Sequence, residues 1–175
     1  MLDVPTLRTE RLVLRGHRMS DFEDSFSLWS DSSVTRFIGG RPFSEEEVWI
    51  RLLRYAGSWA QLGFGFWAVF AADSGAFVGE VGFADYRRDL QPSIHGTPEI
   101  GWALLPAAQG RGLATEAVRA AVAWGDGAFA DPRTVCIIDP GNLPSLRVAE
   151  KLGYRAILQT VYKGDPTLLL ERLRG

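Results

Sequence analysis

The stretch PAAQGRGLATEAVRAAVAWG, residues 106–125, decides the fold of this chain. A loop with glycines at positions 110 and 112 leads directly into a segment whose alanines and valines recur every three or four residues, which predicts a helix from about Gly112 to Phe129. The first turn of a helix carries unpaired N–H groups and a partial positive charge, and glycines let a ligand approach the backbone closely. The stretch therefore predicts an anion-binding loop at the start of a helix.

Strands and helices are predicted on both sides of this loop. Alternating or continuous apolar runs bounded by turn residues predict strands over 10–18, 64–72, 76–84, 98–106, 134–139, 156–162 and 167–172. Turns are expected at 73–75 and 164–166, and a polar loop at 87–97. Three further helices are predicted from their capping residues: one starting at Ser20 or Asp21 and carrying Phe22, Phe26 and Trp29, one starting at Ser44 with Glu47 and stopping near Gly63, and one starting at Asn142 with Pro144 and ending at Gly153.

Composition limits the class of protein. The 175 residues are 46% hydrophobic and 23% charged with a net charge of −2, which is typical of an ordinary globular protein and gives no basic footprint for nucleic acid. The order of the predicted strands and helices, with no linker or repeat between them, indicates one α/β domain over residues 1–175. The single cysteine excludes an internal disulfide and a cysteine-cluster metal site, and we expect no metal. The polar N-terminus lacks the apolar region of a signal peptide, and the longest apolar run, residues 66–72, is too short for a membrane span. We expect a cytoplasmic protein that binds no membrane.

Several anion-binding designs compete for the glycine loop. A P-loop requires lysine after the last glycine, and none follows Gly112. A dinucleotide fingerprint requires a third glycine where Thr115 stands, and the preceding half of the chain is not a strand–helix–strand unit. A tight strand-to-helix turn that binds nothing is the remaining structural alternative.

A third binding design matches the residues. Gln109 to Ala114 fits the Q/R-x-x-G-x-G/A signature of the GNAT acetyltransferases, and NLPSLRVAEKLGY, residues 142–154, resembles the second motif of that family. The opening LRTERLVLRGHRMSDFEDSF, residues 7–26, resembles the RimJ/RimL-like branch, whose named members acetylate N-termini of ribosomal proteins. The resemblance implies the GNAT fold: a central, mostly antiparallel mixed sheet that splays open where strand 98–106 meets strand 134–139, with helices on both faces.

The resemblance also implies a co-substrate, acetyl-coenzyme A. Backbone groups of Leu104 and Leu105 should then pair with the pantetheine arm, and Asn142 should face the cofactor. Arg111 either reaches a phosphate through its side chain or is a solvated arginine. The pyrophosphate should be held by amides of the loop and first helical turn, Gln109, Gly110, Arg111, Gly112, Leu113, Ala114 and Thr115.

Acetyl transfer to an amine needs a neutral nucleophile. An α-amine with a pKa near 7.7–8.0 is partly neutral at pH 7, whereas a lysine amine near 10.4 requires a base. Glu99, at the start of the cofactor strand, is the first candidate for the base, and a structural salt bridge at the pocket rim is the alternative. Glu80 is a weaker candidate. His17 and His95, in or near polar loops, are expected at the surface.

The proton donor departs from the family pattern. Many GNAT proteins carry a tyrosine seven residues after the asparagine, where this chain has Ala149. Ser145 matches the N-x-x-S pattern of the RimJ/RimL-like branch and could serve the coenzyme sulfur, or it could only bond the helix start. Tyr154 is expected to be a packing residue. Cys136 is expected to be a small buried hydrophobe rather than a nucleophile.

The acceptor site is the least defined part of the sequence. It should lie between the first two long helices and the 87–97 loop, with walls drawn from aromatic residues that could equally be core: Trp29, Phe37, Trp49, Phe83 and Tyr86. The predicted activity is acetyl transfer from acetyl-coenzyme A to a primary amine of a protein N-terminus or a small molecule, by direct attack in a ternary complex in a monomer or homodimer. The alternatives are a non-catalytic acyl-coenzyme A sensor and a nucleotide-dependent enzyme.

Overall fold

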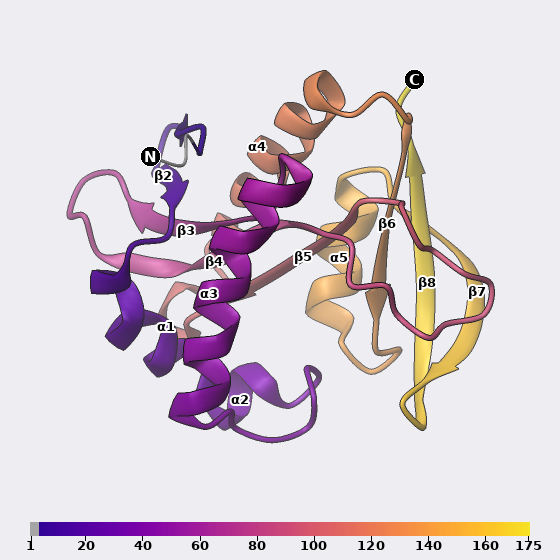
Figure 1. The fold of residues 1–175 in the computed structure, drawn as a ribbon, viewed down its shortest axis with the longest axis horizontal. Helices are drawn as coiled ribbons and strands as arrows, with labels where there is room; N and C mark the ends of the chain where they lie inside the picture. The colour runs from indigo at the N-terminus through magenta and orange to yellow at the C-terminus, as the bar shows by residue number, and fades with distance from the viewer. Residues whose placement is uncertain (1–3) are drawn as a thin grey trace.

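A computed structural model describes residues 4–175, which form one eight-stranded sheet (Figure 1). Every neighbouring pair of strands is antiparallel except β5 and β6. The strand order is β1-β2-β3-β4-β5-β6-β8-β7. The strands are β1 (Leu7–Arg8), β2 (Leu12–Gly16), β3 (Phe66–Ala71), β4 (Phe77–Ala84), β5 (Glu99–Leu104), β6 (Arg133–Ile138), β7 (Arg155–Tyr162) and β8 (Asp165–Leu173).

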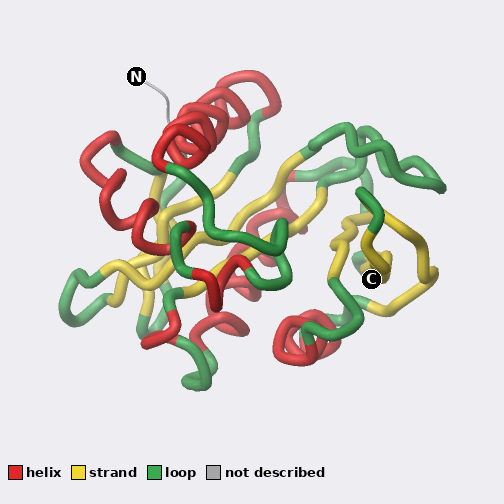
Figure 2. The backbone as a smooth tube through the Cα atoms, turned by 90° about the horizontal axis from the view of Figure 1, so that it is seen from below, coloured by secondary structure: helices red, strands yellow, loops and turns green. Residues whose placement is uncertain are grey.

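Helices cover both faces of this sheet (Figure 2). On one face α4 and α5 pack against the main core, which contains Trp67, Val81, Phe83 and Ile100. On the other face α1 and α3 form two smaller clusters with β3, β4 and β5. The helices are α1 (Phe22–Trp29), α2 (Ser32–Thr35), α3 (Glu45–Leu62), α4 (Leu113–Ala128) and α5 (Leu143–Lys151). Within residues 4–175, no helix combines the length and the hydropathy that crossing a membrane requires.

The sheet opens between β5 and β6, as the sequence predicted. These two parallel strands pair at only one register position, Glu99 with Val135, where the Val135 N–H donates to the Pro98 carbonyl oxygen at 3.1 Å. Beyond that position β5 continues to Leu104 and β6 to Ile138 without pairing. The opening leaves one edge of β5 without a strand partner.

The predicted capping signals are confirmed for two of the three helices. Ser44 and Glu47 form a capping box at α3, which ends at Gly63, and the Asn142 side chain accepts from the Ser145 N–H at α5. The prediction that a side chain caps the start of α1 was wrong. Asp21 stands at the N-cap position but makes no side-chain cap hydrogen bond, because its carboxylate is held by Arg15 and by the backbone N–H of Arg18.

The closing hairpin turns earlier than predicted. Lys163 and Gly164, with φ of 52° and 92°, make a two-residue turn, and β8 begins at Asp165. Pro166 therefore lies in a strand rather than in the turn. It is tolerated there because β6 pairs with β8 only as far as Leu168, so the side of Pro166 that lacks an N–H faces no partner strand.

Candidate functional site

A cavity of about 620 Å³ lies at the opening of the sheet. β5 contributes Glu99 and Trp102 to its lining, β6 contributes Cys136, and α5 contributes Ser145, with Asn142 just before it. The cavity is closed on the remaining sides by α1, α3, the segment between α2 and α3, the loop after β4, and the β7–β8 hairpin. Strands that face each other without pairing thus enclose space large enough for a small substrate.

The glycine loop lies beyond the far end of β5 and does not itself line this cavity. Gly110 and Gly112 have φ of 73° and 77°, values that other residues rarely adopt. Gly112 is the N-cap of α4 and offers no side chain, and within residues 4–175 no acceptor bonds the N–H groups of residues 110–115. Arg111 is exposed. The predicted helix start with free donors is therefore present.

Arg11, which the sequence analysis missed, fixes this loop from the turn between β1 and β2. Its Nε and Nη2 both lie 2.6 Å from Glu116 Oε2 in the first turn of α4, and its Nη1 donates to the Arg111 carbonyl oxygen at 3.0 Å. Thr9 adds a 2.6 Å hydrogen bond to Glu116. An exposed arginine 100 positions away in the sequence carries no local signal, so only the fold identifies it.

At the end of β5, some backbone N–H and carbonyl groups pair with β4 and others point toward the gap between β5 and β6. The Leu105 N–H donates to the Val78 carbonyl oxygen at 3.0 Å, so it is already used. Because neighbouring residues of a strand direct their backbone groups to opposite sides, those of Leu104 and Trp102 point toward the opening. The Gln109 side chain donates to the Leu104 carbonyl oxygen at 3.0 Å.

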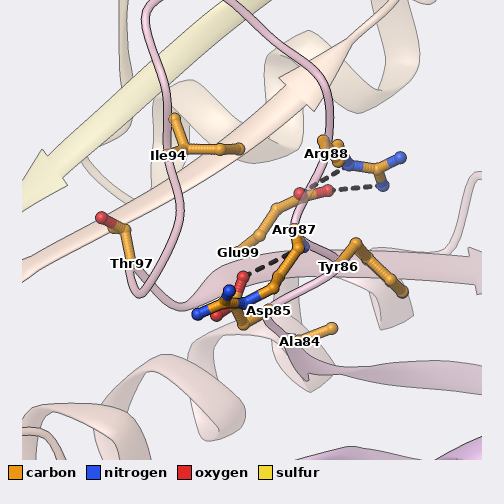
Figure 3. Close-up of a pocket in the computed structure, with 8 residues that line it drawn as sticks. All are labelled: Ala84, Asp85, Tyr86, Arg87, Arg88, Ile94, Thr97 and Glu99. Atoms are coloured by element: carbon orange, nitrogen blue, oxygen red, sulfur yellow. Dashed lines mark hydrogen bonds and ion pairs between the residues drawn. The ribbon is translucent and has the colours of Figure 1, made fainter.

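Glu99 is buried and held by an ion pair with Arg88 from the loop after β4 (Figure 3). Arg88 Nε and Nη2 lie 2.7 and 2.8 Å from the two carboxylate oxygens. Burial works to lower the pKa of Arg88, but the hydrogen bonds and charge of Glu99 outweigh it and raise that pKa above its usual range. The salt bridge that was the alternative interpretation of Glu99 thus exists, on a residue that also lines the cavity.

Ser145 lines the same cavity from α5. It is its backbone N–H, not its hydroxyl, that bonds Asn142 Oδ1 at 3.3 Å, and within residues 4–175 the hydroxyl has no hydrogen bond. The start of α5 therefore does not depend on the Ser145 side chain. Ala149, at the position of the family tyrosine, is fully buried and can donate no proton.

Three of the five predicted wall residues line the cavity: Trp29, Phe37 and Tyr86. The prediction was wrong for the other two. Phe83 points into the core on the α4 side of β4, where Phe129 packs against it, and Trp49 lies on the outer side of α3 with 45% of its surface exposed. The spacing of aromatic residues in the sequence does not show which face of the sheet or helix their side chains lie on.

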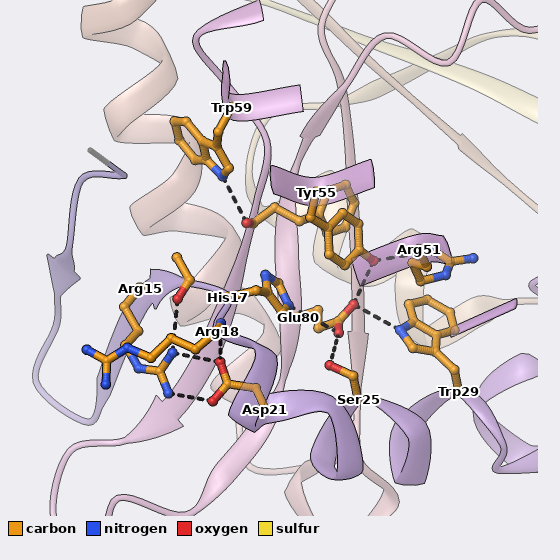
Figure 4. A network of polar contacts seen from close by, with 12 residues as sticks. Arg15, His17, Arg18, Asp21, Ser25, Trp29, Arg51, Tyr55, Trp59 and Glu80 are labelled. Atoms are coloured by element: carbon orange, nitrogen blue, oxygen red, sulfur yellow. Dashed lines mark hydrogen bonds and ion pairs between the residues drawn. The ribbon is translucent and has the colours of Figure 1, made fainter. Parts of the chain in front are cut away.

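A buried polar network lies next to the cavity, on the β4 face beneath α1 and α3 (Figure 4). Fully buried Glu80 accepts from Ser25, Trp29 Nε1 and Tyr55 at 2.8, 2.9 and 2.7 Å, and His17 Nε2 lies 3.2 Å from it. Burial favours a raised pKa for Glu80, but these neighbours, His17 first, lower it overall. Glu80 does not line the cavity, so the structure gives it a structural position.

Two histidines were expected at the surface, and only one of them is there. His95 is exposed, and its Nε2 lies 2.9 Å from the Arg88 carbonyl oxygen. The prediction for His17 was wrong, because its side chain is only 4% exposed and its ring lies against Tyr55 and Glu80. A position just after a strand resembles a loop in the sequence, but Tyr55 of α3 and Glu80 of β4 enclose this ring.

The two remaining predictions concern packing residues. Cys136 is buried, and burial raises the pKa of its thiol far above the ordinary value, which disfavours a thiolate nucleophile. Tyr154 is fully buried, with its hydroxyl 2.7 Å from the Thr134 hydroxyl. Both agree with their predicted roles in packing, although Cys136 also touches the cavity.

The chain is similar to known proteins over most of its length. The model of the acetyltransferase (GNAT) domain matches residues 11–155. The uncharacterized N-acetyltransferase YnaD of Bacillus subtilis (strain 168) is 29% identical over 149 residues, which cover 85% of this chain and 82% of that protein. The structure of a candidate GnaT-family acetyltransferase from Bordetella pertussis is 38% identical, with a TM-score of 0.85 over 96% of this chain and 99% of that one.

A more distant likeness extends to RimL, a ribosomal L7/L12 α-N-protein acetyltransferase whose structure contains coenzyme A. It is 16% identical, with a TM-score of 0.78 over 97% of this chain and 98% of that one, so this likeness shows the fold alone. The domain match and the closer relatives, together with the sheet that opens between β5 and β6, show that the chain belongs to the GNAT acetyltransferase family.

Proposed function

We propose that this protein transfers the acetyl group of acetyl-coenzyme A to a primary amine, of a protein N-terminus or of a small molecule, by direct attack in a ternary complex. The observation that carries the proposal is the opening between β5 and β6, where Glu99 and Ser145 line one cavity from facing walls. Membership of the family supports acetyl transfer in general. We also propose that the protein belongs to the RimJ/RimL-like branch of the family, which residues 7–26 resemble.

The coenzyme would lie along the unpaired edge of β5. N–H groups of residues 110–115 would take the pyrophosphate, because a helix start with free donors stabilises a phosphate without a lysine. The Gln109 N–H, which was predicted to join them, already donates to the Pro106 carbonyl oxygen at 3.1 Å. Backbone groups of Leu104 would pair with the pantetheine arm, and Asn142 would face it from the start of α5. Five residue steps at about 3.4 Å each separate Leu104 from Glu99, so about 17 Å of extended chain reaches the cavity.

The reaction would then involve two proton transfers, one from the amine and one to the departing sulfur. The amine nitrogen forms a bond to the thioester carbonyl carbon, and its proton passes to Glu99 directly or through water. The carbon–sulfur bond breaks, and the thiolate takes up a proton from water to leave as a thiol, with the Ser145 hydroxyl orienting the sulfur; Glu99 returns its own proton to solvent. A thiol with a pKa near 8.5 is a tolerable leaving group, so positioning supplies much of the rate.

The test is the release of free thiol from acetyl-coenzyme A in the presence of amines of different classes: N-terminal peptides, amino acids, polyamines and aminoglycosides. We expect turnover with one class and a rate that falls at least about tenfold in Glu99→Gln, in line with the usual contribution of general base catalysis. Tight binding of acetyl-coenzyme A with no transfer to any amine would instead favour a non-catalytic sensor.

The glycine loop has its own test. Gly112→Asp should abolish binding of coenzyme A, because it brings a negative charge to the position proposed for the pyrophosphate. Gly112→Ala is the matched control, because it imposes the same backbone strain at φ 77° without the charge. Equal coenzyme A affinity in the wild type and Gly112→Asp, measured by calorimetric titration, would exclude the loop as the phosphate site.

A further inference from the structure

Basic side chains make up much of the charged lining of the cavity. Arg36, Arg51, Arg54 and Arg88 line it together with Lys163, whereas its acidic lining consists of Glu99, Asp139 and Asp165. Glu99 is already paired with Arg88. Among the described residues no carboxylate lies within salt-bridge distance of the other three arginines. The lining of the cavity therefore holds guanidinium groups that no carboxylate of the described chain contacts directly.

Arg51 is the most firmly held of these cations. Its guanidinium carbon lies 3.9 Å from the centre of the Trp29 ring and 4.8 Å from that of Phe43, and these two rings stack on each other. Its Nη1 donates to the Tyr55 hydroxyl at 3.3 Å, and Tyr55 in turn donates to buried Glu80 (Figure 4). The network around Glu80 thus fixes the direction of the Arg51 side chain.

One part of Arg51 lacks a partner. Its Nε is buried and, within residues 4–175, has no hydrogen-bond acceptor. A buried guanidinium N–H without an acceptor is costly, and the planar fork of arginine matches the two oxygens of a carboxylate. Because Nε is closed to solvent, Nη2 is the group that could meet an incoming anion: within residues 4–175 it has no hydrogen bond, and it is not among the buried atoms without a partner.

Tyr86 links this cation to the proposed catalytic end. The guanidinium carbons of Arg54 and Arg88 lie 5.0 and 4.4 Å from the centre of its ring, and Arg88 holds Glu99 (Figure 3). Burial, first of all, raises the pKa of the Tyr86 hydroxyl, while the charges of Arg54, Arg51 and Arg88 act to lower it. An anion bound by Arg51 and Arg54 would therefore lie near Glu99.

We infer that the acceptor is a small amino-carboxylate such as a free amino acid, with its amine at Glu99 and its carboxylate bound by Arg51 and Arg54. This inference rests on the proposed function and narrows it to one substrate class. A polyamine or an aminoglycoside would bring several positive charges to a cavity lined by unpaired arginines. A protein N-terminus lacks the nearby carboxylate unless an acidic residue follows.

The test compares amino acids with their own carboxamides as acetyl acceptors, because the two have the same shape and differ in the charge of one group. Loss of that charge also lowers the pKa of the neighbouring amine, which by itself favours the carboxamide, so a preference for the acid is a stringent result. In the wild type we expect kcat/KM to be at least about tenfold higher for the acid, which is the usual effect of one charge-assisted hydrogen bond. Arg51→Gln should shrink that ratio toward one, mainly through KM, and Arg51→Lys should restore part of it. Arg54→Gln, at an exposed position, repeats the test without risk to folding.

Arg119→Gln is the matched control, since Arg119 is exposed on α4 and does not line the cavity, so it should keep the full ratio. Equal transfer to acid and carboxamide, or a preference for peptide N-termini or polyamines, would overturn the inference and leave the proposed function standing. Calorimetric titration of the coenzyme A complex with N-acetyl amino acids and their amides separates the two proposals. If no amine is acetylated, the proposed function fails, and equal binding of acid and amide would overturn the inference independently.

Discussion

At the level of single residues, Ser145 lines the cavity with a side chain that the fold does not need. The backbone of Ser145 bonds Asn142 while its hydroxyl is free. Ser145→Ala should therefore lower kcat by about tenfold if the hydroxyl serves the departing sulfur, and leave the coenzyme A affinity and the melting temperature unchanged. Steady-state kinetics and calorimetric titration of the same preparation measure both. An unchanged kcat would reduce Ser145 to a residue of the helix start.

Glu80 is the opposite case, because all of its contacts lie inside the fold. Gln has the same shape, but its NH₂ group would face the donors of Ser25, Trp29 or Tyr55, and one buried donor would lose its acceptor. Glu80→Gln should lower the free energy of unfolding at pH 7 by about 3 kcal/mol, the usual cost of breaking a buried charged network. Urea unfolding measures the loss, and a loss below about 1 kcal/mol would contradict it.

The same variant should show a characteristic pH dependence. The pKa of Glu80 in the folded protein is lowered from 4.5. Its stabilising contribution is therefore complete above about pH 4.5 and is lost as the pH falls toward the folded pKa, because the unfolded chain takes up the proton first. Gln cannot titrate, so the stability gap between wild type and variant should be constant from pH 7 to 5 and narrow below pH 4.5.

Among the elements, α4 depends on a residue from another part of the sheet. Arg11 joins the β1–β2 turn to Glu116 in the first turn of α4 and to the Arg111 carbonyl oxygen. Arg11→Met removes these contacts at an exposed position, so it should cost less than about 1 kcal/mol of stability. We expect it to weaken coenzyme A binding several-fold, because the donors of the loop are then less well ordered.

Arg8→Met, at an exposed position in β1, is the matched control for this measurement. An equal affinity for coenzyme A in Arg11→Met and Arg8→Met would show that the loop is ordered without the clamp.

The elements themselves were largely predictable from the sequence. Ser44 with Glu47, and Asn142 with Pro144, make their helix starts through contacts three residues apart, so the signal is local. Asp21 shows the limit, because Arg15 competes for the carboxylate that would have capped α1. Pro166 shows another, since its tolerance depends on where a neighbouring strand stops pairing.

The sequence could predict only those parts of the candidate site that consecutive residues form. The loop from Gln109 and the position of Ser145 follow from motifs in the chain. The partners of Glu99 and Arg51, by contrast, come from the loop after β4 and from aromatic rings on α1 and before α3. Such pairings depend on the registers of distant strands, which one sequence does not specify.

For the whole molecule, the opening of the sheet separates β1–β5 from β6–β8, with one register position joining β5 to β6. A ligand lying between them should stabilise both halves together. At 100 times its Kd, coenzyme A should add about 2.7 kcal/mol and raise the melting temperature by about 5–10 °C. Hydrogen exchange should slow along both β5 and β6, and Gly112→Asp should show neither effect. Protection confined to α4 would contradict a ligand in the opening.

The ion pair between Arg88 and Glu99 affects which end of the acceptor contributes binding energy in the proposed reaction. A guanidinium already occupies the carboxylate, so an arriving ammonium gains only the difference between two similar ion pairs. The reacting end of the acceptor then adds little to binding, and the opposite end must supply the affinity. An amine that is weakly held as a cation loses little binding energy when it gives up its proton. The acetylated product, a neutral amide, offers no charge to compete with Arg88 for Glu99, which favours its release.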